Sequence, residues 1–416
     1  MENLLATEKD AATDDNRQIR QLMVFFAVAY FVQMIGQRGG LIGQPLLVYL
    51  KSQGLSPVRF SQFEFLIGLP WIIKPVYGLL SDFVPLLGYH RRSYLLLMNA
   101  VAALGFCCIT GLETPAAIGI ALFISSIGVA FTDVVVDAIM VERGQYFNRV
   151  KQFQGQQWLW FSIAAVLATL SGGYLAQHFL PGNALRLAAP ITGIALLILL
   201  PVSWVIAKEP KAVLNTGHFG EVRDELKKAL RSKSLWIVGI FLLLWNFDPS
   251  FGTPLQYILR DQLKLGEMFL GTLNTVAAIG SIVGALWFER MAGHFRTRQL
   301  ICGSAIAGAI VTLGFLFLLN HIVILLLFFL AGIMQMFATL SLLSLAGEIC
   351  PPKVAGVIFA TFASIMNFAS QSSDLAGSKL YESVFHSHLA PLIWTSAIFT
   401  ITILIIVPWL PKTDIG

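Results

Sequence analysis

Three ionisable residues lie inside stretches apolar enough to cross a membrane: Lys74, Asp133 and Asp137. A charge at the bilayer centre costs about 2.5–3.5 kcal/mol on insertion scales, so such residues pair, face the protein interior or line a water-filled cavity. Lys74 lies eight residues before Asp82, and Asp133 lies nine residues before Glu142. Because Asp82 and Glu142 both end their segments on the same membrane side, this spacing places Lys74 and Asp133 at similar depth. Asp137 lies one turn further in on the same face. If the second and fourth segments are neighbours, we expect Lys74 to form an ion pair with Asp133 or Asp137. It is either purely structural, or two carboxylates share one cation and one of them carries a proton.

Two further charges stand where a helix can break. Arg38 has glycines on both sides, and its guanidinium can bind a carboxylate in a two-pronged fashion. The alternative is that Arg38 reaches towards the outer membrane interface. Asp248 is followed by Pro249 and, further on, Pro254, which predicts a broken helix near mid-depth. Asp248 is therefore a candidate substrate or gate residue, with helix capping as the alternative.

A polar stripe runs along one otherwise apolar segment near the C-terminus. Its members, spaced by three or four residues, are Thr361, Ser364, Asn367, Gln371, Asp374 and Ser378. One wet face on such a helix indicates a cavity or another polar helix beside it. We predict that Asn367, Gln371 and Asp374 bind substrate, with helix-to-helix hydrogen bonding as the alternative. Trp158 could stack on a ligand ring or anchor at the membrane interface.

The composition shows which elements must hold these residues. The 416-residue chain is 56% hydrophobic and 12% charged, with a mean hydropathy of +0.74, whereas soluble domains carry about 25% charged residues. Spanning helices need about 20 apolar residues, and alternating barrel strands are absent. We predict an all-α membrane protein with twelve transmembrane helices in two pseudo-symmetric six-helix bundles. The segments are 21–50, 60–81, 93–111, 115–141, 152–179, 185–207, 234–259, 267–289, 299–318, 321–348, 353–383 and 389–410.

The charges predict the orientation. If both termini are cytoplasmic, the cytoplasmic segments hold most of the 28 basic residues, in accordance with the positive-inside rule. The net charge of +5 is spread over separate loops, which argues against nucleic-acid binding. Because no signal or transit peptide is recognisable, we predict an integral protein of a bacterial inner membrane, acting as a monomer.

The longest polar segment divides the chain six helices from six. The predicted units are a cytoplasmic tail at 1–20, the first bundle at 21–207, a linker at 208–233, the second bundle at 234–410 and a tail at 411–416. Helical spacing of apolar residues within the linker predicts either a surface helix on the inner leaflet or a solvated tether.

A short charged hairpin after the second segment carries Gly78, Asp82, Arg91 and Arg92, and a shorter echo recurs in the second half. The repeat resembles the gating loop of the major facilitator superfamily, whose two halves rock around a central site. This resemblance implies latches that tune a two-state balance, with Asp82 meeting the eleventh helix near residues 351–353. The predicted gating residues are Gly78, Asp82, Arg91, Arg92, Glu142, Arg143, Gly284, Glu289, Arg290 and Glu348.

Residues 71–82, continuing through Gly88, Tyr89 and the arginine pair, resemble the folate–biopterin transporter family, and so do 133–143 and 156–173. The resemblance implies proton-coupled transport of a folate or pterin-like anion. Arg38 and Lys74 would then bind the glutamate tail, while Asp133 or Asp137 accepts hydrogen bonds from the pterin. Trp158 would stack on the ring. The second half resembles only a general facilitator.

Other chemistry is excluded by what is missing from the sequence. There is no nucleophile–base constellation, no phosphate-binding loop and no metal-ligand spacing, so we predict neither an enzyme nor a cofactor or metal. Two other functions are open. One is a transporter of another amphiphilic solute, such as a drug or a muropeptide-like sugar. The other is a non-transporting scaffold relative, which the polar stripe argues against.

Overall fold

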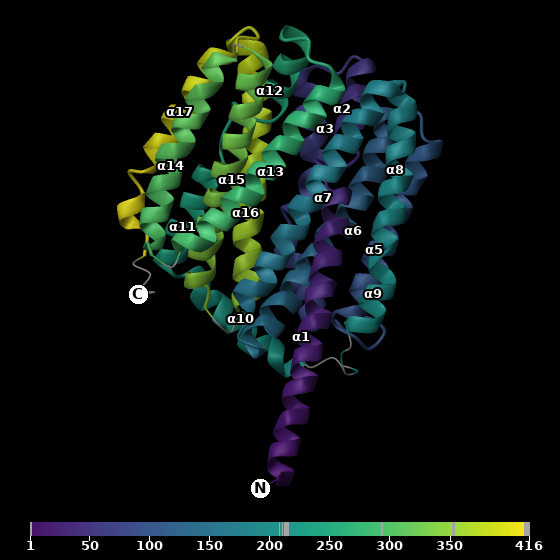
Figure 1. Cartoon of the computed structure of the whole chain (residues 1–416), viewed down its shortest axis with the longest axis vertical. Helices are drawn as coiled ribbons and strands as arrows, with labels where there is room; N and C mark the ends of the chain where they lie inside the picture. Colours follow the sequence, from purple (N-terminus) through teal and green to yellow (C-terminus); the bar gives the residue numbers. More distant parts are fainter. Residues whose placement is uncertain are drawn as a thin grey trace.

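The computed structural model describes residues 2–207, 209, 211, 216–292, 294–318, 320–351 and 354–411. These residues form helices and short connections, and their one extended pairing is an isolated bridge between Leu86 and Tyr89. Figure 1 shows two groups of helices side by side, one from each half of the chain, with both termini at the same end of the molecule. We call this end the termini end. The predicted all-α fold is confirmed.

The helices follow the predicted segments closely. The first half contains α1 (Glu2–Gly36) with α2 (Gly43–Ser52), α3 (Pro57–Gly68) with α4 (Lys74–Phe83), α5 (Arg92–Cys108), α6 (Pro115–Tyr146), α7 (Val150–His178), and α8 (Pro181–Leu197) with α9 (Leu199–Ile206). The connection carries α10 (Thr216–Leu230). The second half contains α11 (Lys233–Trp245) with α12 (Thr253–Tyr257), α13 (Glu267–Ala292), α14 (Thr297–Gly314), α15 (His321–Ile349), α16 (Ala355–Lys379) and α17 (Leu389–Ile403).

Ten of the described helical units are long and apolar enough to cross a membrane by length and composition. Two crossings fall outside this criterion for physical reasons. The α11 helix has only 13 residues because its crossing is interrupted before α12. The α16 helix is long, but its polar stripe lowers its hydropathy. Together they complete the twelve crossings of the fold.

Two predicted helices are not continuous. The segment 21–50 breaks between α1 and α2, where a Cβ on Gly40 would lie 2.3 Å from the carbonyl oxygen of Met34. The segment 60–81 breaks between α3 and α4, around a short 3-10 turn that contains Pro70. Pro75 at the start of α4 has no N–H to continue the ladder. The bend expected at the glycines around Arg38 is present, whereas the break between α3 and α4 has no counterpart among the sequence predictions.

The predicted break in the seventh crossing is present between α11 and α12. Gly252 has φ 91 there, a conformation that side chains with a Cβ rarely adopt. The α1–α2 and α11–α12 breaks occupy corresponding positions in the two halves. Paired interruptions of this kind mark binding sites in transporter folds.

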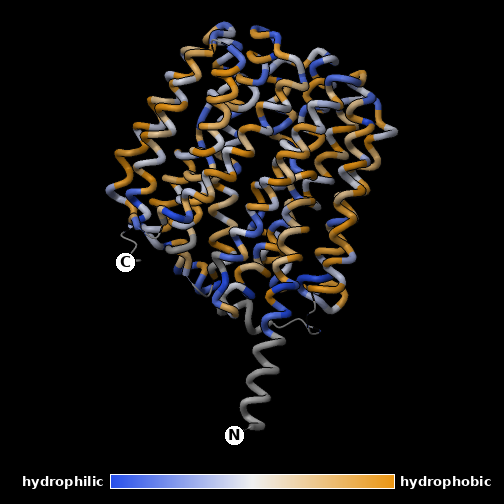
Figure 2. The backbone as a smooth tube through the Cα atoms, in the orientation of Figure 1, coloured by the Kyte–Doolittle hydropathy of each residue, from blue (hydrophilic) through white to orange (hydrophobic). Residues whose placement is uncertain are grey.

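The core of the first half extends onto a few residues of the second half (Tyr257, Ile258, Tyr381 and Leu392), and the second half also has cores of its own. The first core gathers around Phe25, Phe26 and Phe153, and the second around Phe241 and Leu345. Figure 2 shows apolar residues along the outer helices and hydrophilic ones towards the ends and the middle. Among the described helices, the most extensive contact between the halves is that of α7 with α13. There, a Cβ on Gly173 would lie 2.9 Å from the Cα of Gly271.

Candidate functional site

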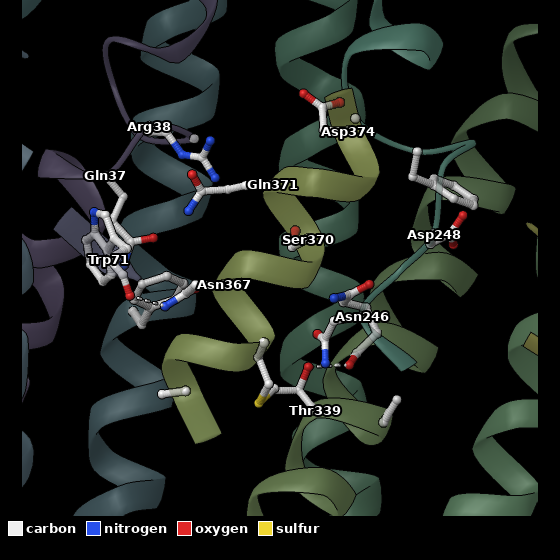
Figure 3. Close-up of a pocket in the computed structure, with 18 of the residues that line it drawn as sticks. Gln37, Arg38, Trp71, Asn246, Asp248, Thr339, Asn367, Ser370, Gln371 and Asp374 are labelled. Atoms are coloured by element: carbon white, nitrogen blue, oxygen red, sulfur yellow. Dashed lines mark hydrogen bonds between the residues drawn. The ribbon is translucent and has the colours of Figure 1, made fainter. Parts of the chain in front are cut away.

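A cavity of about 810 Å³ lies between the two halves. Pockets of about 300–1,000 Å³ hold drug-sized ligands. Every predicted substrate-binding residue lines it: Arg38, Lys74, Asp133, Asp137, Trp158, Asp248, Asn367, Gln371 and Asp374. The structure therefore brings these residues to one chamber, although their role in binding stays a prediction. Figure 3 shows the part of the chamber beside α16.

The expected ion pair forms between Lys74 and Asp133. Lys74 Nζ lies 2.6 Å from Asp133 Oδ2, and both side chains are buried. The lysine follows the α3–α4 break directly, and its Nζ also lies 4.7 Å from the centre of the Trp71 ring. Gln33 of α1 donates a second hydrogen bond to Asp133. The pair thus joins α4 to α6 at the wall of the cavity.

Asp137 is held by neutral donors. Its carboxylate accepts hydrogen bonds from the Tyr30 hydroxyl and, at 3.5 Å, from Gln157 Nε2. Trp158 packs edge-on against Tyr30, with ring centres 6.4 Å apart. Trp158 also lines the cavity, while its stacking on a ligand ring stays a prediction. Tyr30, Asp137 and Trp158 together form a patch with an aromatic face beside hydrogen-bond acceptors.

Arg38 occupies the non-helical connection between α1 and α2 and pairs with Glu64 of α3. Arg38 Nη1 lies 3.3 Å from Glu64 Oε2 and 3.5 Å from the Glu64 carbonyl oxygen. The Arg38 side chain is 34% exposed and that of Glu64 is 18% exposed. Arg38 thus faces the chamber and not only the membrane interface.

The charges that line the cavity are not balanced. Among the described residues, the lining cations are Arg38, Lys74 and Arg260, and the lining acids are Glu64, Asp133, Asp137, Asp248 and Asp374. Each of the three cations already has an acidic partner, since Arg260 binds Glu267 through two nitrogens at 2.7 and 2.8 Å. An anionic ligand must therefore share or displace an existing partner.

Asp248 caps the helix break and also lines the cavity. Its Oδ1 accepts hydrogen bonds from the Ser250 N–H at 3.3 Å and the Ser250 hydroxyl at 3.0 Å, so it caps the break between α11 and α12. It also lines the cavity. The capping alternative is therefore present in the structure, while a role in substrate binding stays a prediction.

The polar stripe of α16 binds the broken second crossing. Asn367 Nδ2 donates to the Trp71 carbonyl at 3.1 Å, and Gln371 Nε2 donates to the Gly68 carbonyl at 3.2 Å; Figure 3 shows Asn367 reaching Trp71. In a continuous helix the Trp71 carbonyl would accept from residue 75, but Pro75 has no N–H. The stripe therefore supplies donors that the α3–α4 break removes, so the helix-to-helix alternative is realised at the cavity wall.

Asp374 ties three elements together. Its carboxylate accepts from the Thr253 N–H at 2.7 Å, the Thr253 hydroxyl at 2.8 Å and the Ser61 hydroxyl at 3.1 Å. Ser61 Oγ also lies 2.6 Å from Ser378 Oγ. These contacts join α3 to α12 and α16 at the end opposite the termini. Lys51 also binds Asp261 across the two halves at this end.

The cavity reaches towards the termini end. Gln154 and Phe359 line it, and each lies within about 6 Å, along the helix axis, of the start of its helix at the termini end. The described polar contacts between the halves thus close one end, while the chamber extends towards the other.

The charged hairpin forms its own contacts. Arg91 Nη2 lies 2.7 Å from Asp82 Oδ1, and the Arg92 guanidinium stacks 3.7 Å from the Trp204 ring centre. Glu209, at the start of the connection, accepts from the N–H groups of Arg91 and Arg92, both at 2.8 Å, and so caps α5. The described hairpin is therefore bound to the connection. Residues 352 and 353 of its expected partner region lie outside the described residues.

The other predicted gating residues form no comparable cluster. Glu142, Glu289 and Arg290 are exposed, Arg143 is half-buried, and no ion pair within the described part of the chain includes them. The Glu348 side chain lies outside the described residues. Gly284 packs against α15, where a Cβ would lie 2.4 Å from the Ile333 carbonyl oxygen. Gly78 has ordinary room, with Val134 at 3.7 Å.

Sequence reasoning missed several residues of the site. Glu64 lies inside the predicted segment 60–81, so the cost of a buried charge would have identified it. Tyr30 and Gln33 carry no such signal, because polar residues without a charge are common in apolar helices. Arg260 follows directly after the predicted segment 234–259, yet it lines the cavity beside the broken seventh crossing.

The helix arrangement defines a membrane protein of the major facilitator fold. A D-xylose–proton symporter of known structure superposes with a TM-score of 0.73 at 16% identity, covering 95% of this chain and 99% of that one. A nucleoside transporter gives a TM-score of 0.67 at 14% identity, covering 94% and 98%. At these identities the likeness concerns the fold.

The chain belongs to the BT1 family, whose match covers residues 38–415. The folate-biopterin transporter of Synechocystis sp. is 28% identical over 375 residues, which cover 84% of this chain and 73% of that protein. Folate transporter 2 of Plasmodium falciparum is 24% identical over 382 residues, covering 86% and 82%. The chain is therefore a membrane transporter and not an enzyme.

Proposed function

We propose that this protein is a secondary active transporter of folate or pterin-like anions, coupled to protons and working by alternating access. The observation that carries the proposal is the central cavity, where Arg38 and the Lys74–Asp133 pair meet an aromatic and carboxylate patch. The named activities of the BT1 relatives support the choice of substrate.

A folate molecule offers groups that match this chamber. The negative charge of its glutamate tail suits Arg38 or Lys74, because a guanidinium or ammonium group binds a carboxylate strongly when partly desolvated. The amino group and ring N–H of the pterin suit the carboxylates of Asp133 or Asp137. Trp158 offers an aromatic face for the flat ring.

Proton coupling follows from the excess of acids in the chamber. Asp137 has a carboxylate neighbour in Asp133 but, among the described residues, no cation of its own. Two nearby carboxylates with one lysine are difficult to keep ionised together. We therefore propose that Asp133 and Asp137 carry the transported proton.

Alternating access requires the polar contacts at the closed end to break. We propose that the contacts of Asp374, Gln371 and Asn367 form the outer gate and that the Asp82–Arg91 hairpin belongs to the cytoplasmic gate. This assigns both termini to the cytoplasm of a bacterial cell, with the chain in the inner membrane as a monomer. The predicted residues of the second-half latch complete the inner gate.

A ligand screen of the purified protein tests the substrate. A ligand that binds only the folded state at 100 times its Kd adds about 2.7 kcal/mol of stability, so folates and pterins should raise the melting temperature. Unrelated organic anions serve as the control. Stabilisation by drugs or sugar-like solutes, with no response to any pterin, would favour the alternative of a different amphiphilic substrate.

A further inference from the structure

The Arg38–Glu64 pair is the loosest of the three cation pairs in the cavity. Its shortest contact is 3.3 Å, whereas the Lys74 pair measures 2.6 Å and Arg260 makes two contacts at 2.7 and 2.8 Å. Charged N–H···O contacts usually measure about 2.7–2.9 Å. The Arg38 side chain is 34% exposed, against 9% for Lys74 and 5% for Arg260. Of the described cations that line the cavity, Arg38 is thus the one most accessible to a ligand.

The geometry leaves room for a second carboxylate on Arg38. Both of its described contacts to Glu64 use the Nη1 nitrogen. A guanidinium presents its donors as a rigid fork, so the edge that carries Nη2 can bind a carboxylate. Arg38 also lies in the non-helical connection between Gly36 and Gly43, whose backbone is not fixed by a helical ladder.

We propose that Glu64 is the counter-ion that a substrate carboxylate displaces from Arg38, and that Glu64 takes up a proton when it is displaced. The inference rests on the proposed transport of an organic anion. It adds a proton-binding residue that acts only on the carboxylate part of the substrate, separate from Asp133 and Asp137.

The surroundings of Glu64 explain why a proton must replace the arginine. Glu64 lies within the membrane-crossing unit Pro57–Phe83. The charged groups that act on its carboxylate are Arg38, from the α1–α2 connection, and Asp374, from α16. In the described part of the chain, α2, α6 and α12 also pack on α3. The charged residues of α6 and α2 have other partners: Asp133 binds Lys74, Asp137 accepts from Tyr30 and Gln157, and Lys51 binds Asp261. If Arg38 turns to a ligand, only the negative Asp374 is left, which disfavours an ionised Glu64.

The exchange keeps the charge of the chamber constant. One ligand carboxylate brings one negative charge, and one proton on Glu64 removes one. By linkage, a ligand that binds together with one proton loses affinity as the pH rises. Wherever Glu64 is ionised in the free protein, the loss is up to about tenfold for each pH unit. A ligand without a carboxylate does not need this exchange.

Two ligands that share the pterin ring isolate the effect. The Kd of folate and of biopterin, which has no carboxylate, is measured on purified protein from about pH 5.5 to 7.5, where a free glutamate carboxylate stays ionised. Protons bound at Asp133 or Asp137 affect both ligands through the shared ring. The difference between the two slopes of log Kd against pH therefore reports Glu64, and we expect a difference approaching one in the wild-type protein.

The Glu64→Gln variant should abolish this difference and bind folate more tightly than the wild type near neutral pH. Glu113→Gln, which replaces an exposed acid, is the matched control and should leave both slopes unchanged. Arg38→Gln should weaken folate binding much more than biopterin binding. Equal slopes for the two ligands in the wild type, or a difference that persists in Glu64→Gln, would overturn the exchange while leaving pterin transport intact. Failure of the folded wild type to bind either ligand would refute the proposed function itself.

Discussion

Asn367 supplies a hydrogen bond that the neighbouring helix cannot make for itself. Its Nδ2 donates to the Trp71 carbonyl at 3.1 Å, and the residue that would serve this carbonyl in a helix is Pro75. This hydrogen bond exists only while α16 packs against the α3–α4 break. Asn367→Ala therefore removes a donor from the closed state and not from the open one. The substitution should therefore destabilise the closed outer gate relative to the open one.

The size of the shift follows from the energy of an unsatisfied buried acceptor. Leaving such a group unpaired costs about 1–3 kcal/mol, which corresponds to a change of about five- to 150-fold in a two-state equilibrium. The open and closed states of a transporter differ in free energy by only about a few kcal/mol, so the fraction of molecules with an open outer gate should increase measurably.

Cysteine labelling measures this shift. In a background without the four native cysteines, a cysteine at Leu47 of α2 is buried against the closed end of the cavity. A membrane-impermeant maleimide should label it about five- to 150-fold faster in Asn367→Ala, given the two-state shift above. Thr361→Ala is the control, because Thr361 donates within its own helix to the Val357 carbonyl.

A labelling rate that stays at the wild-type value in Asn367→Ala would refute the gate assigned to the stripe. A double-mutant cycle sharpens the test. Pro75→Ala restores an N–H that can serve the Trp71 carbonyl, so Asn367→Ala should have a smaller effect in that background. Additive effects of the two substitutions would show that the missing proline donor is not the reason for the contact.

Three other predictions concern the charged residues. Lys74→Met and Asp133→Asn should each destabilise the protein by about 3–5 kcal/mol, while the double variant recovers most of the loss in thermal unfolding; a double variant as unstable as the sum would contradict a coupled pair. Proton-driven uptake falls as pH rises, and Asp133→Asn or Asp137→Asn should remove this dependence, so wild-type pH profiles in both would place the proton site elsewhere. Asp82→Asn removes the carboxylate proposed to hold the cytoplasmic gate closed and should favour the state open at the termini end, with lower uptake but retained substrate binding; unchanged accessibility and uptake would remove the latch role.

The residues easiest to predict from the sequence were those with a large cost in the membrane. Lys74 needed an acidic partner, and its depth limited the choice to Asp133 or Asp137, of which the structure pairs Asp133. The break at Asp248 followed from its prolines. The same cost argument applies to Glu64, which lies inside the predicted segment 60–81.

The partners of the polar stripe could not be predicted from sequence. Asn367 and Gln371 bind backbone carbonyls, and any residue type presents a carbonyl. Only the break between α3 and α4 frees these acceptors, and the apolar composition of the segment 60–81 does not reveal this break. The cytoplasmic hairpin illustrates the same limit, because its contact with Glu209 depends on how the connection folds back.

Counterflow of labelled folate in proteoliposomes tests the central claim most directly. Vesicles loaded with unlabelled folate should take up labelled folate in a saturable manner. Unlabelled biopterin should compete with this uptake, and Arg38→Gln should reduce it. Folded wild-type protein that exchanges neither folate nor biopterin would contradict the account.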